Sequence, residues 1–216
     1  MPKFSVIMQS FLGEYPRAAK DRDIKIVNAI KSVLNQSFND CEVIVIADGC
    51  DKTFEIVTNV FEGNEKVSCY VIPKQEIWSG VPRNLGKQMA KGEYCLYLDI
   101  DDFYGNNHLR IINNQLANYD WVWYCDKRYN PITKQFYENP CNISRMSYCG
   151  TSNVCFKRSL DVFWPTDKRA NYGHDYWFIQ DLVSKSSNKT KITTPEYYVC
   201  HIPPHPGGTG YDIENK

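Results

Sequence analysis

The sequence lacks three features that would each narrow the class of protein: paired cysteines, an excess of charge of one sign, and a long apolar run. Its nine cysteines are an odd number and include no C-x-x-C pair, which argues against a disulfide framework and a structural zinc site. Lysine plus arginine and aspartate plus glutamate are equal at 25 each, so general nucleic-acid binding is not expected. No apolar stretch approaches the length of a membrane span, and a strand pattern begins at once, which leaves no room for a signal peptide. We therefore expect a soluble cytoplasmic protein with reduced thiols and no transmembrane segment.

Strand and helix patterns alternate over the first half of the chain. A length of 216 residues fits one α/β domain. The run Glu42-Val43-Ile44-Val45-Ile46-Ala47 is nearly continuous in apolar residues, as expected of a strand covered on both faces. The expected strands are 3–8, 42–47, 67–72 and 93–98, and the expected helices are 24–34, 53–61 and 83–90. This alternation predicts a mostly parallel sheet with right-handed crossovers.

Beyond residue 102 the pattern changes. Turn signals at Asn130-Pro131 and Asn139-Pro140 flank a short aromatic run, which predicts a hairpin or a loop excursion. Further elements are expected as helices at 107–116 and 175–183 and as strands at 121–124 and 153–156. We expect a mixed or antiparallel extension that builds one wall of a cleft. Residues 203–216 carry no periodic pattern and are expected to form a mobile tail.

Three carboxylates follow one apolar run, at Asp99, Asp101 and Asp102. Alternate strand residues share a face, so Asp99 and Asp101 can point the same way. Their repulsion is relieved if a divalent cation lies between them, and their hard oxygen atoms suit Mg²⁺ or Mn²⁺ with positions left for substrate phosphates. The carboxyl edge of a parallel sheet is where such folds bind ligands. The pattern therefore predicts a metal–diphosphate site, with a solvated acidic turn as the competing interpretation.

Three stretches together resemble the GT-A fold nucleotide-sugar glycosyltransferases, specifically the large inverting family two. The first runs from FSVIM through SVLNQSF to EVIVIADG, the second joins RNLG, AKGEY and LDIDD, and the third is GHDYW at 173–177. Their order and spacing match the family across nearly the entire chain. The resemblance implies a Rossmann-like, mostly parallel central sheet flanked by helices, with a mixed or antiparallel C-terminal extension on the acceptor side. It implies one domain over 1–216, with a nucleotide-sugar half at 1–102, an acceptor-side half at 103–202 and the tail at 203–216.

The resemblance also implies a reaction. The expected enzyme is an inverting, metal-dependent glycosyltransferase that moves a sugar from a nucleoside diphosphate donor, UDP favoured, to a hydroxyl of a glycan or glycoconjugate. Asp175 matches the general base. Asp101 matches the chief ligand of Mn²⁺ or Mg²⁺, and Asp99 the companion that reaches the ribose or the metal's water shell. His201 matches a histidine that some relatives place near the metal or diphosphate.

Three further residues receive roles in donor binding. Phe11 offers a flat partner for the base, and Asp48 resembles the aspartate that accepts the uracil imide hydrogen. Arg83 resembles the arginine that approaches the donor diphosphate, where a guanidinium can bind bidentately.

The chain departs from the family pattern at two positions. Ala47 stands where the family often has a first aspartate, and His174 stands where it usually has an acidic residue before Asp175. Aromatic neighbours of Asp175 predict partial desolvation, which would raise its pKa.

Two other interpretations of the sequence compete with this one. Sugar nucleotidyltransferases need a glycine-rich, arginine-containing loop directly after the first strand, and residues 9–13 lack one. A catalytically weak module of the same fold, binding a nucleotide sugar or a glycan, remains the alternative.

Overall fold

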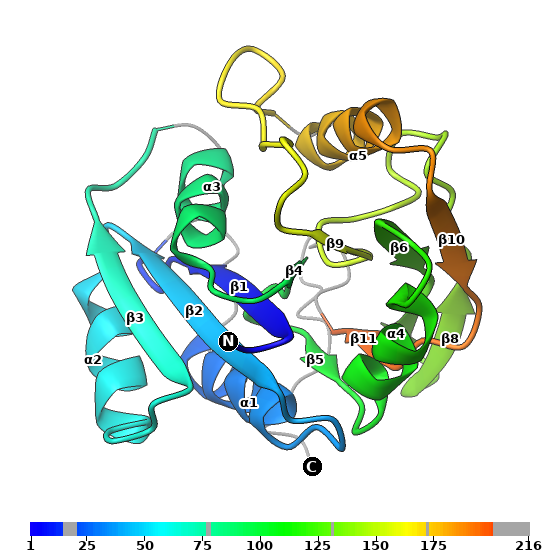
Figure 1. Cartoon of the computed structure of the whole chain (residues 1–216). Coiled ribbons are helices and arrows are strands. Elements are labelled where there is room, and N and C mark those ends of the chain that lie inside the picture. The colour runs from blue at the N-terminus through cyan, green and yellow to red at the C-terminus, as the bar shows by residue number, and fades with distance from the viewer. Residues whose placement is uncertain (15–20, 77–78, 131, 172, 201–216) are drawn as a thin grey trace.

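The core of the protein is a seven-stranded mixed sheet (Figure 1). The computed structural model describes residues 1–14, 21–76, 79–130, 132–171 and 173–200. The strands of this sheet are β1 (Phe4–Ser10), β2 (Cys41–Asp48), β3 (Val67–Ile72), β4 (Tyr94–Tyr97), β6 (Trp121–Tyr124), β9 (Val154–Lys157) and β10 (Lys189–Ile192). Their order is β10-β6-β9-β4-β1-β2-β3. Strands β3, β2, β1 and β4 are parallel, and β9 runs antiparallel between β4 and β6. This confirms the expected α/β architecture, in which a parallel core continues into a mixed extension.

Helices cover both faces of the sheet. They are α1 (Arg22–Leu34), α2 (Asp51–Val60), α3 (Gly80–Met89), α4 (His108–Leu116) and α5 (His174–Lys185). Val43 and Val45 belong to the same core as the apolar residues of α1, α2 and α4. Ile44 and Ile46 belong to a second core with residues of α3 and α5. Alternate residues of a strand point to opposite faces, so the run in β2 feeds both cores.

A second, smaller sheet closes the carboxyl-terminal half. It contains β5 (Phe103–Tyr104), β11 (Tyr197–Val199), β7 (Asp126–Asn130) and β8 (Gln135–Asn139), in that order. Strands β7 and β8 form the antiparallel hairpin that the turn signals predict. Strand β11 pairs with β5, so the end of the described chain returns beside the segment that follows the acidic residues (Figure 1).

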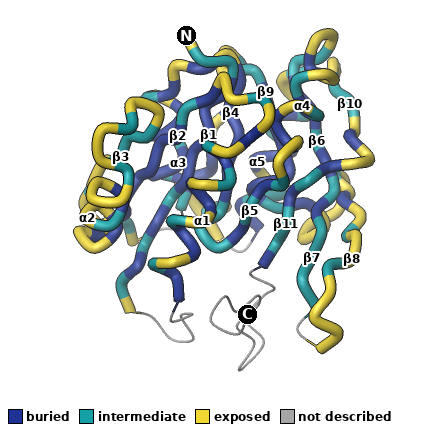
Figure 2. Tube along the Cα trace, turned by 90° about the horizontal axis from the view of Figure 1, so that it is seen from below, coloured by how far each residue is buried: buried dark blue, intermediate teal, exposed yellow. Residues whose placement is uncertain are grey.

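Burial concentrates in the middle of the large sheet. In Figure 2 the traces of β1, β2 and β4 are largely buried, whereas much of α2 and of β8 is exposed. The polar residues that end β1 and β2, and those that follow β4, therefore lie at the edge of a well-packed core, which suits a binding site.

Two of the differences from the sequence prediction concern α3 and β10. Helix α3 begins at Gly80 instead of residue 83, because Pro82 is tolerated in the first turn of a helix. Strand β10 has no predicted counterpart, since its sequence Lys-Thr-Lys-Ile is polar and short, as is common at the edge of a sheet. Within the described ranges, no helix combines the length and apolar character that crossing a membrane requires.

Candidate active site

The acidic segment leaves the sheet beside the end of β1. Leu98 donates its backbone N–H to the carbonyl of Ile7 at 3.0 Å, which extends the pairing of β4 by one residue. Asp99 then donates its N–H to the hydroxyl of Ser152 at 3.2 Å. A tight turn follows, in which the N–H of Asp102 donates to the Asp99 carbonyl at 3.1 Å. The backbone of the predicted metal-binding segment is thus fixed at the carboxyl edge of the sheet.

Charges around Asp99 act in opposite directions. Burial raises the pKa of Asp99, the Arg83 guanidinium lowers it, and the carboxylates of Asp101 and Asp175 raise it. The net shift of the Asp99 pKa is upward. The structure therefore brings these acidic residues close enough to repel, and another cation beside them would relieve that repulsion.

Arg83 lies between the acidic segment and α5. Its side chain is buried, and the guanidinium stacks 4.5 Å from the centroid of the Trp164 ring. Nη2 donates to Oδ1 of Asp99 at 3.1 Å, and Nη1 lies 3.1 Å from Nε2 of His174. The neighbouring Asn84 exchanges two hydrogen bonds with the backbone of Trp164 and so fixes the indole. The first turn of α3 thereby aims its arginine at the carboxyl edge of β4.

Asp175 lies in the first turn of α5, where the helix dipole favours a negative charge. The hydroxyl of Thr151 donates to Oδ1 of Asp175 at 2.6 Å, and Nε2 of His174 lies 3.2 Å from the same oxygen. The side chain keeps 27% of its surface exposed, which leaves it accessible from solvent.

The pKa of Asp175 moves in the direction opposite to the prediction. Burial raises it, but His174, the Arg83 guanidinium and the Thr151 hydroxyl lower it, and the net shift is downward. The prediction of a raised pKa is wrong. It rested on desolvation alone, whereas tertiary contacts also place the positive charge of Arg83 and the hydroxyl donor of Thr151 beside Asp175.

Asp48 and Phe11 meet through a lysine that sequence reasoning missed. Lys74 Nζ donates to Oδ2 of Asp48 at 2.7 Å and lies 4.7 Å from the centroid of the Phe11 ring. The backbone N–H of Gln75 donates to Oδ1 of Asp48 at 2.8 Å. Gly49 has a φ of +64°, and a Cβ there would collide with Lys74. A signal for Lys74 did exist, since it follows the end of a third parallel strand at the same edge of the sheet.

Asp102 has a structural role distinct from that of its acidic neighbours. Its buried carboxylate accepts hydrogen bonds from the Tyr197 hydroxyl at 2.6 Å and from the Cys200 N–H at 2.8 Å. Burial and the nearby Asp101 and Asp99 raise its pKa well above the ordinary value. Asp102 therefore ties the end of β11 to the acidic segment. His201 follows Cys200 but lies outside the described residues, so its predicted role remains a prediction.

The acidic segment fits a metal ion that shares its ligands with a substrate. Among the described residues, no group of three or more His, Cys, Asp or Glu side chains is arranged as a metal site. Asp99 and Asp101 provide two hard carboxylates, and Arg83 already binds one oxygen of Asp99. Mg²⁺ and Mn²⁺ commonly bind through one or two carboxylates, with substrate phosphates and water completing the shell. The donor set is compatible with that arrangement.

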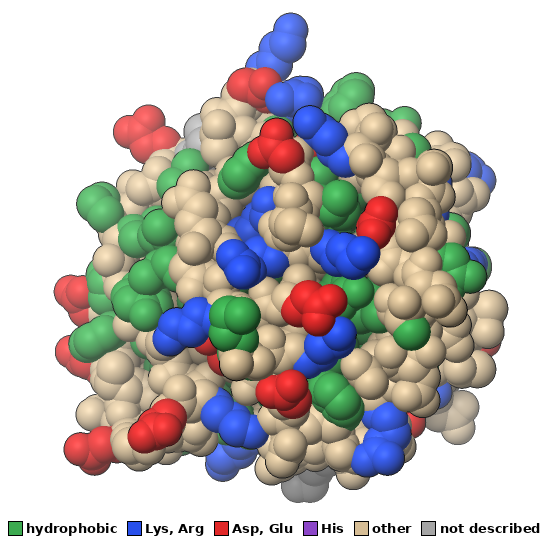
Figure 3. All heavy atoms as spheres, viewed as in Figure 1, with side chains coloured by type: hydrophobic (Ala, Val, Ile, Leu, Met, Phe, Trp, Pro, Cys, Tyr) green, Lys and Arg blue, Asp and Glu red, His purple; other side chains and the backbone are tan. Residues whose placement is uncertain are grey.

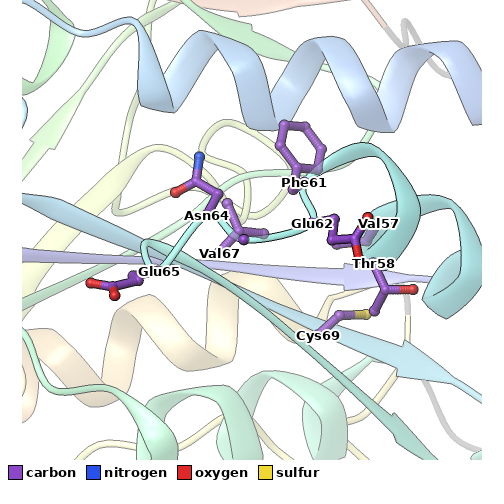
Figure 4. A pocket seen from close by; sticks show the side chains of 9 residues that line it. Val57, Thr58, Phe61, Glu62, Asn64, Glu65, Val67 and Cys69 are labelled. Carbon is purple, nitrogen blue, oxygen red and sulfur yellow. The ribbon is translucent and has the colours of Figure 1, made fainter.

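A surface hollow of about 510 Å³ lies away from these residues (Figure 4). It is lined by the end of α2, the following turn and the amino-terminal part of β3, including Val57, Phe61 and Val67. Figure 3 shows hydrophobic side chains on the same side of the molecule, where Phe54 and Tyr70 are exposed. Asp48 pairs in register with Ile72, at the opposite end of β3, so this hollow does not belong to the candidate site.

The chain matches a known family over most of its length. Residues 22–185 match the sequence profile of the family described as "Glycosyl transferase family 2". That range includes Asp48, Arg83, Asp99, Asp101 and Asp175.

Individual proteins resemble the chain in sequence or in structure. An uncharacterized glycosyltransferase of Haemophilus influenzae is 33% identical over 121 residues, which cover 55% of this chain and 44% of that protein. Residues 1–349 of Staphylococcus aureus TarS in complex with UDP-GlcNAc have a TM-score of 0.71 at 19% identity, covering 91% of this chain and 58% of that TarS fragment. A mannosyltransferase of Pyrobaculum calidifontis in complex with GDP-Man and Mn²⁺ has a TM-score of 0.65 at 16% identity, covering 95% and 58%. The chain spans less than two thirds of each of these proteins. The structural likeness confirms the GT-A-type fold.

Proposed function

Because the chain belongs to glycosyl transferase family 2, we propose that it transfers one sugar from a nucleoside diphosphate donor to a hydroxyl of a glycan or glycoconjugate acceptor. One observation carries the proposal: contacts run without a break from Asp99 through Arg83 and His174 to Asp175. These contacts connect two parts of the site. One is the acidic strand end at Asp99, which suits a metal ion and a diphosphate, and the other is the carboxylate of Asp175, which suits a proton acceptor. We assign donor binding to residues 1–102 and acceptor binding to residues 103–202 of a single domain.

Asp101 and Asp99 are proposed to hold Mn²⁺ or Mg²⁺ together with the donor diphosphate. The ion supplies Lewis-acid stabilisation of the leaving group when bound. Arg83 adds a second positive charge, and its stacking on Trp164 limits the freedom it must lose on binding. The Mn²⁺ in the related mannosyltransferase supports a divalent ion in this fold.

Asp175 is proposed to act as the general base. It would accept the proton of the acceptor hydroxyl as that oxygen attacks the anomeric carbon from the face opposite the diphosphate, so one displacement inverts the configuration. Its lowered pKa keeps the carboxylate ionised at neutral pH and also makes it a weaker base, so the proposed role depends on its position beside the acceptor. The exposed part of its side chain gives an acceptor access.

Uracil is the proposed base of the nucleotide donor. Phe11 offers a ring for stacking, and Asp48 offers an acceptor for the imide hydrogen. The Asp48 carboxylate already accepts bonds from Lys74 and Gln75, so the uracil would share it with them or displace one. The UDP-GlcNAc bound to TarS supports a uridine donor, whereas the GDP-Man in the mannosyltransferase keeps the comparison with guanosine necessary.

The proposed setting is the cytoplasm. Apart from Cys200, the cysteines are free thiols and most of them are buried, which suits a reducing compartment.

A donor panel tests the proposed function. UDP-, GDP- and TDP-sugars are incubated with the protein and a mixture of hydroxyl acceptors, and nucleoside diphosphate release is measured with Mn²⁺ and with a chelator. We expect metal-dependent release from at least one donor. Asp175→Asn keeps the shape of the side chain and removes its basicity, and we expect it to lower the transfer rate by roughly a hundredfold or more with donor affinity unchanged.

Asp181→Asn, on the same helix, is the matched control and should transfer at the wild-type rate. Proton NMR of the first product should show the anomeric configuration opposite to that of the donor. Tight donor binding without release from any donor would favour the binding module. Release with retained configuration would remove the proposed role of Asp175.

A further inference from the structure

His174 contacts three groups whose chemistry determines where its proton lies. Nδ1 is 2.7 Å from the carbonyl oxygen of Asn171, and Nε2 is 3.1 Å from Nη1 of Arg83. A carbonyl can only accept a hydrogen bond and a guanidinium can only donate one. Both bonds form together when Nδ1 carries the proton and Nε2 accepts from Arg83. The geometry therefore selects the neutral Nδ1–H tautomer of His174.

The same tautomer determines what His174 does to Asp175. Nε2 lies 3.2 Å from Oδ1 of Asp175, but in this tautomer the nitrogen has no proton to donate. Thr151 donates to that oxygen instead. Of the three groups that lower the pKa of Asp175, Arg83 and Thr151 act in this tautomer, whereas His174 would act only as the doubly protonated imidazolium.

Because His174 is neutral, it does not compensate the positive charge of the Arg83 guanidinium. The guanidinium binds one carboxylate, Asp99, and one uncharged acceptor, His174. A carboxylate in place of the imidazole would compensate the positive charge of Arg83 and add a negative charge beside Asp175. The Trp164 ring, 5.5 Å from the imidazole and 4.5 Å from the guanidinium, packs against both groups.

We propose that His174 is a positioning residue. As a neutral imidazole, it orients Arg83 towards the donor diphosphate and donates no proton to Asp175. This rests on the proposed function, since it assumes that Arg83 binds a diphosphate and that Asp175 accepts a proton. Among the described residues, the charged and titratable groups that interact with the pair include Arg83 of α3, Asp99 after β4, and Cys149 before Thr151.

Three variants at one position separate the two effects of His174. His174→Gln retains a neutral acceptor for Arg83, and its donor KM should stay within about threefold of wild type. His174→Leu removes the acceptor, and its donor KM should rise about tenfold, as expected for one lost hydrogen bond to a charged group. His174→Glu adds a carboxylate beside Asp175, and the acidic limb of its pH profile for kcat should move about one unit to higher pH.

Ile179→Val is the control for a general loss of packing. Ile179 is buried on the same helix, one turn further along, and its shortening costs about 1 kcal/mol of stability. Neither its donor KM nor its acidic limb should differ from wild type. A wild-type donor KM in His174→Leu, or an unshifted limb in His174→Glu, overturns the inference.

Imidazole ¹⁵N chemical shifts give a reading that needs no turnover. The chain has four histidines, and the signal lost in His174→Gln identifies His174. We expect Nδ1 protonated and Nε2 unprotonated at pH 8, with Nε2 shifting in Arg83→Met. An Nε2–H tautomer overturns the inference even if the enzyme is active. An inactive wild-type protein with the expected tautomer would instead remove the proposed function and leave the Arg83–His174 geometry confirmed.

Discussion

Acid should destabilise this protein through one buried histidine, His108. Its side chain is completely buried at the start of α4, where the imidazole stacks on Tyr104 with ring centroids 4.1 Å apart. Within the described part of the chain, neither ring nitrogen has a hydrogen-bond partner. Burial lowers the pKa of His108 from 6.5 to about 3, because nothing nearby stabilises the charged ring.

The sign and size of the effect follow from the two pKa values. Above pH 6.5 the imidazole is neutral in both the folded and the unfolded states, so His108 costs no stability through protonation. Between pH 6.5 and about 3 the unfolded chain binds a proton that the folded protein does not, so the free energy of unfolding falls as the pH falls. The limiting slope is about 1.4 kcal/mol per pH unit. From pH 8 to pH 5 the integrated loss is about 2 kcal/mol.

Urea unfolding of the wild type and of His108→Phe, followed by tryptophan fluorescence from pH 8 to pH 5, measures this loss. Phenylalanine retains a flat ring beside Tyr104 and does not titrate. Any constant cost of repacking cancels when each protein is compared with itself across pH, and so do the carboxylates that both share. The wild type should lose about 2 kcal/mol more than the variant over this range. Parallel stability curves would refute a neutral, buried His108, and His108→Leu would show whether the result depends on the ring.

Three further predictions concern the site. Asp101→Ala should lower metal-dependent transfer by roughly a hundredfold or more. Its stability in urea unfolding should be unchanged or higher, because Asp101 is half-buried and raises the pKa of Asp99. Turnover near the wild-type rate would exclude Asp101 as the main metal ligand. Calorimetry should show UDP binding more tightly than GDP or TDP. Equal or reversed affinities would exclude uracil as the preferred base. Gly49→Ala should cost about 1–3 kcal/mol of stability, because φ is +64° and the added Cβ meets Lys74; an unfolding midpoint equal to wild type would contradict that strain.

Most of the large sheet could be predicted because its evidence is local. The apolar run of β2 is buried along nearly its whole length, and two cores require its alternate residues to be apolar. Strand β10 could not be predicted in the same way, because its polar residues owe their strand geometry to pairing with β6. Pairing of that kind leaves no periodic signal in the sequence.

The same distinction between local and tertiary evidence applies to the candidate site. Asp99, Asp101 and Asp175 could be proposed from strand ends, a helix start and a family resemblance. The contact between Arg83 and His174 could not, since 91 residues separate them in the sequence. The downward shift of the Asp175 pKa depends in part on Arg83 and Thr151, which lie far from it in the sequence, so local reasoning about aromatic neighbours gave the wrong sign. Lys74 and Thr151 were missed for a related reason, because each acts on an aspartate that lies far away along the chain.

The charges that meet at the site support the proposed use of a metal ion. Asp101, Asp175 and Arg83 all act electrostatically on Asp99, so three carboxylates meet one guanidinium. Their formal sum is −2, and a nucleoside diphosphate adds two or more negative charges to a partly buried space. Repulsion of that size opposes donor binding unless a cation enters with the donor. Donor affinity should therefore rise with Mn²⁺ or Mg²⁺ concentration, whereas binding of an uncharged acceptor sugar should not, and calorimetric titrations of each ligand at graded metal concentrations distinguish the two.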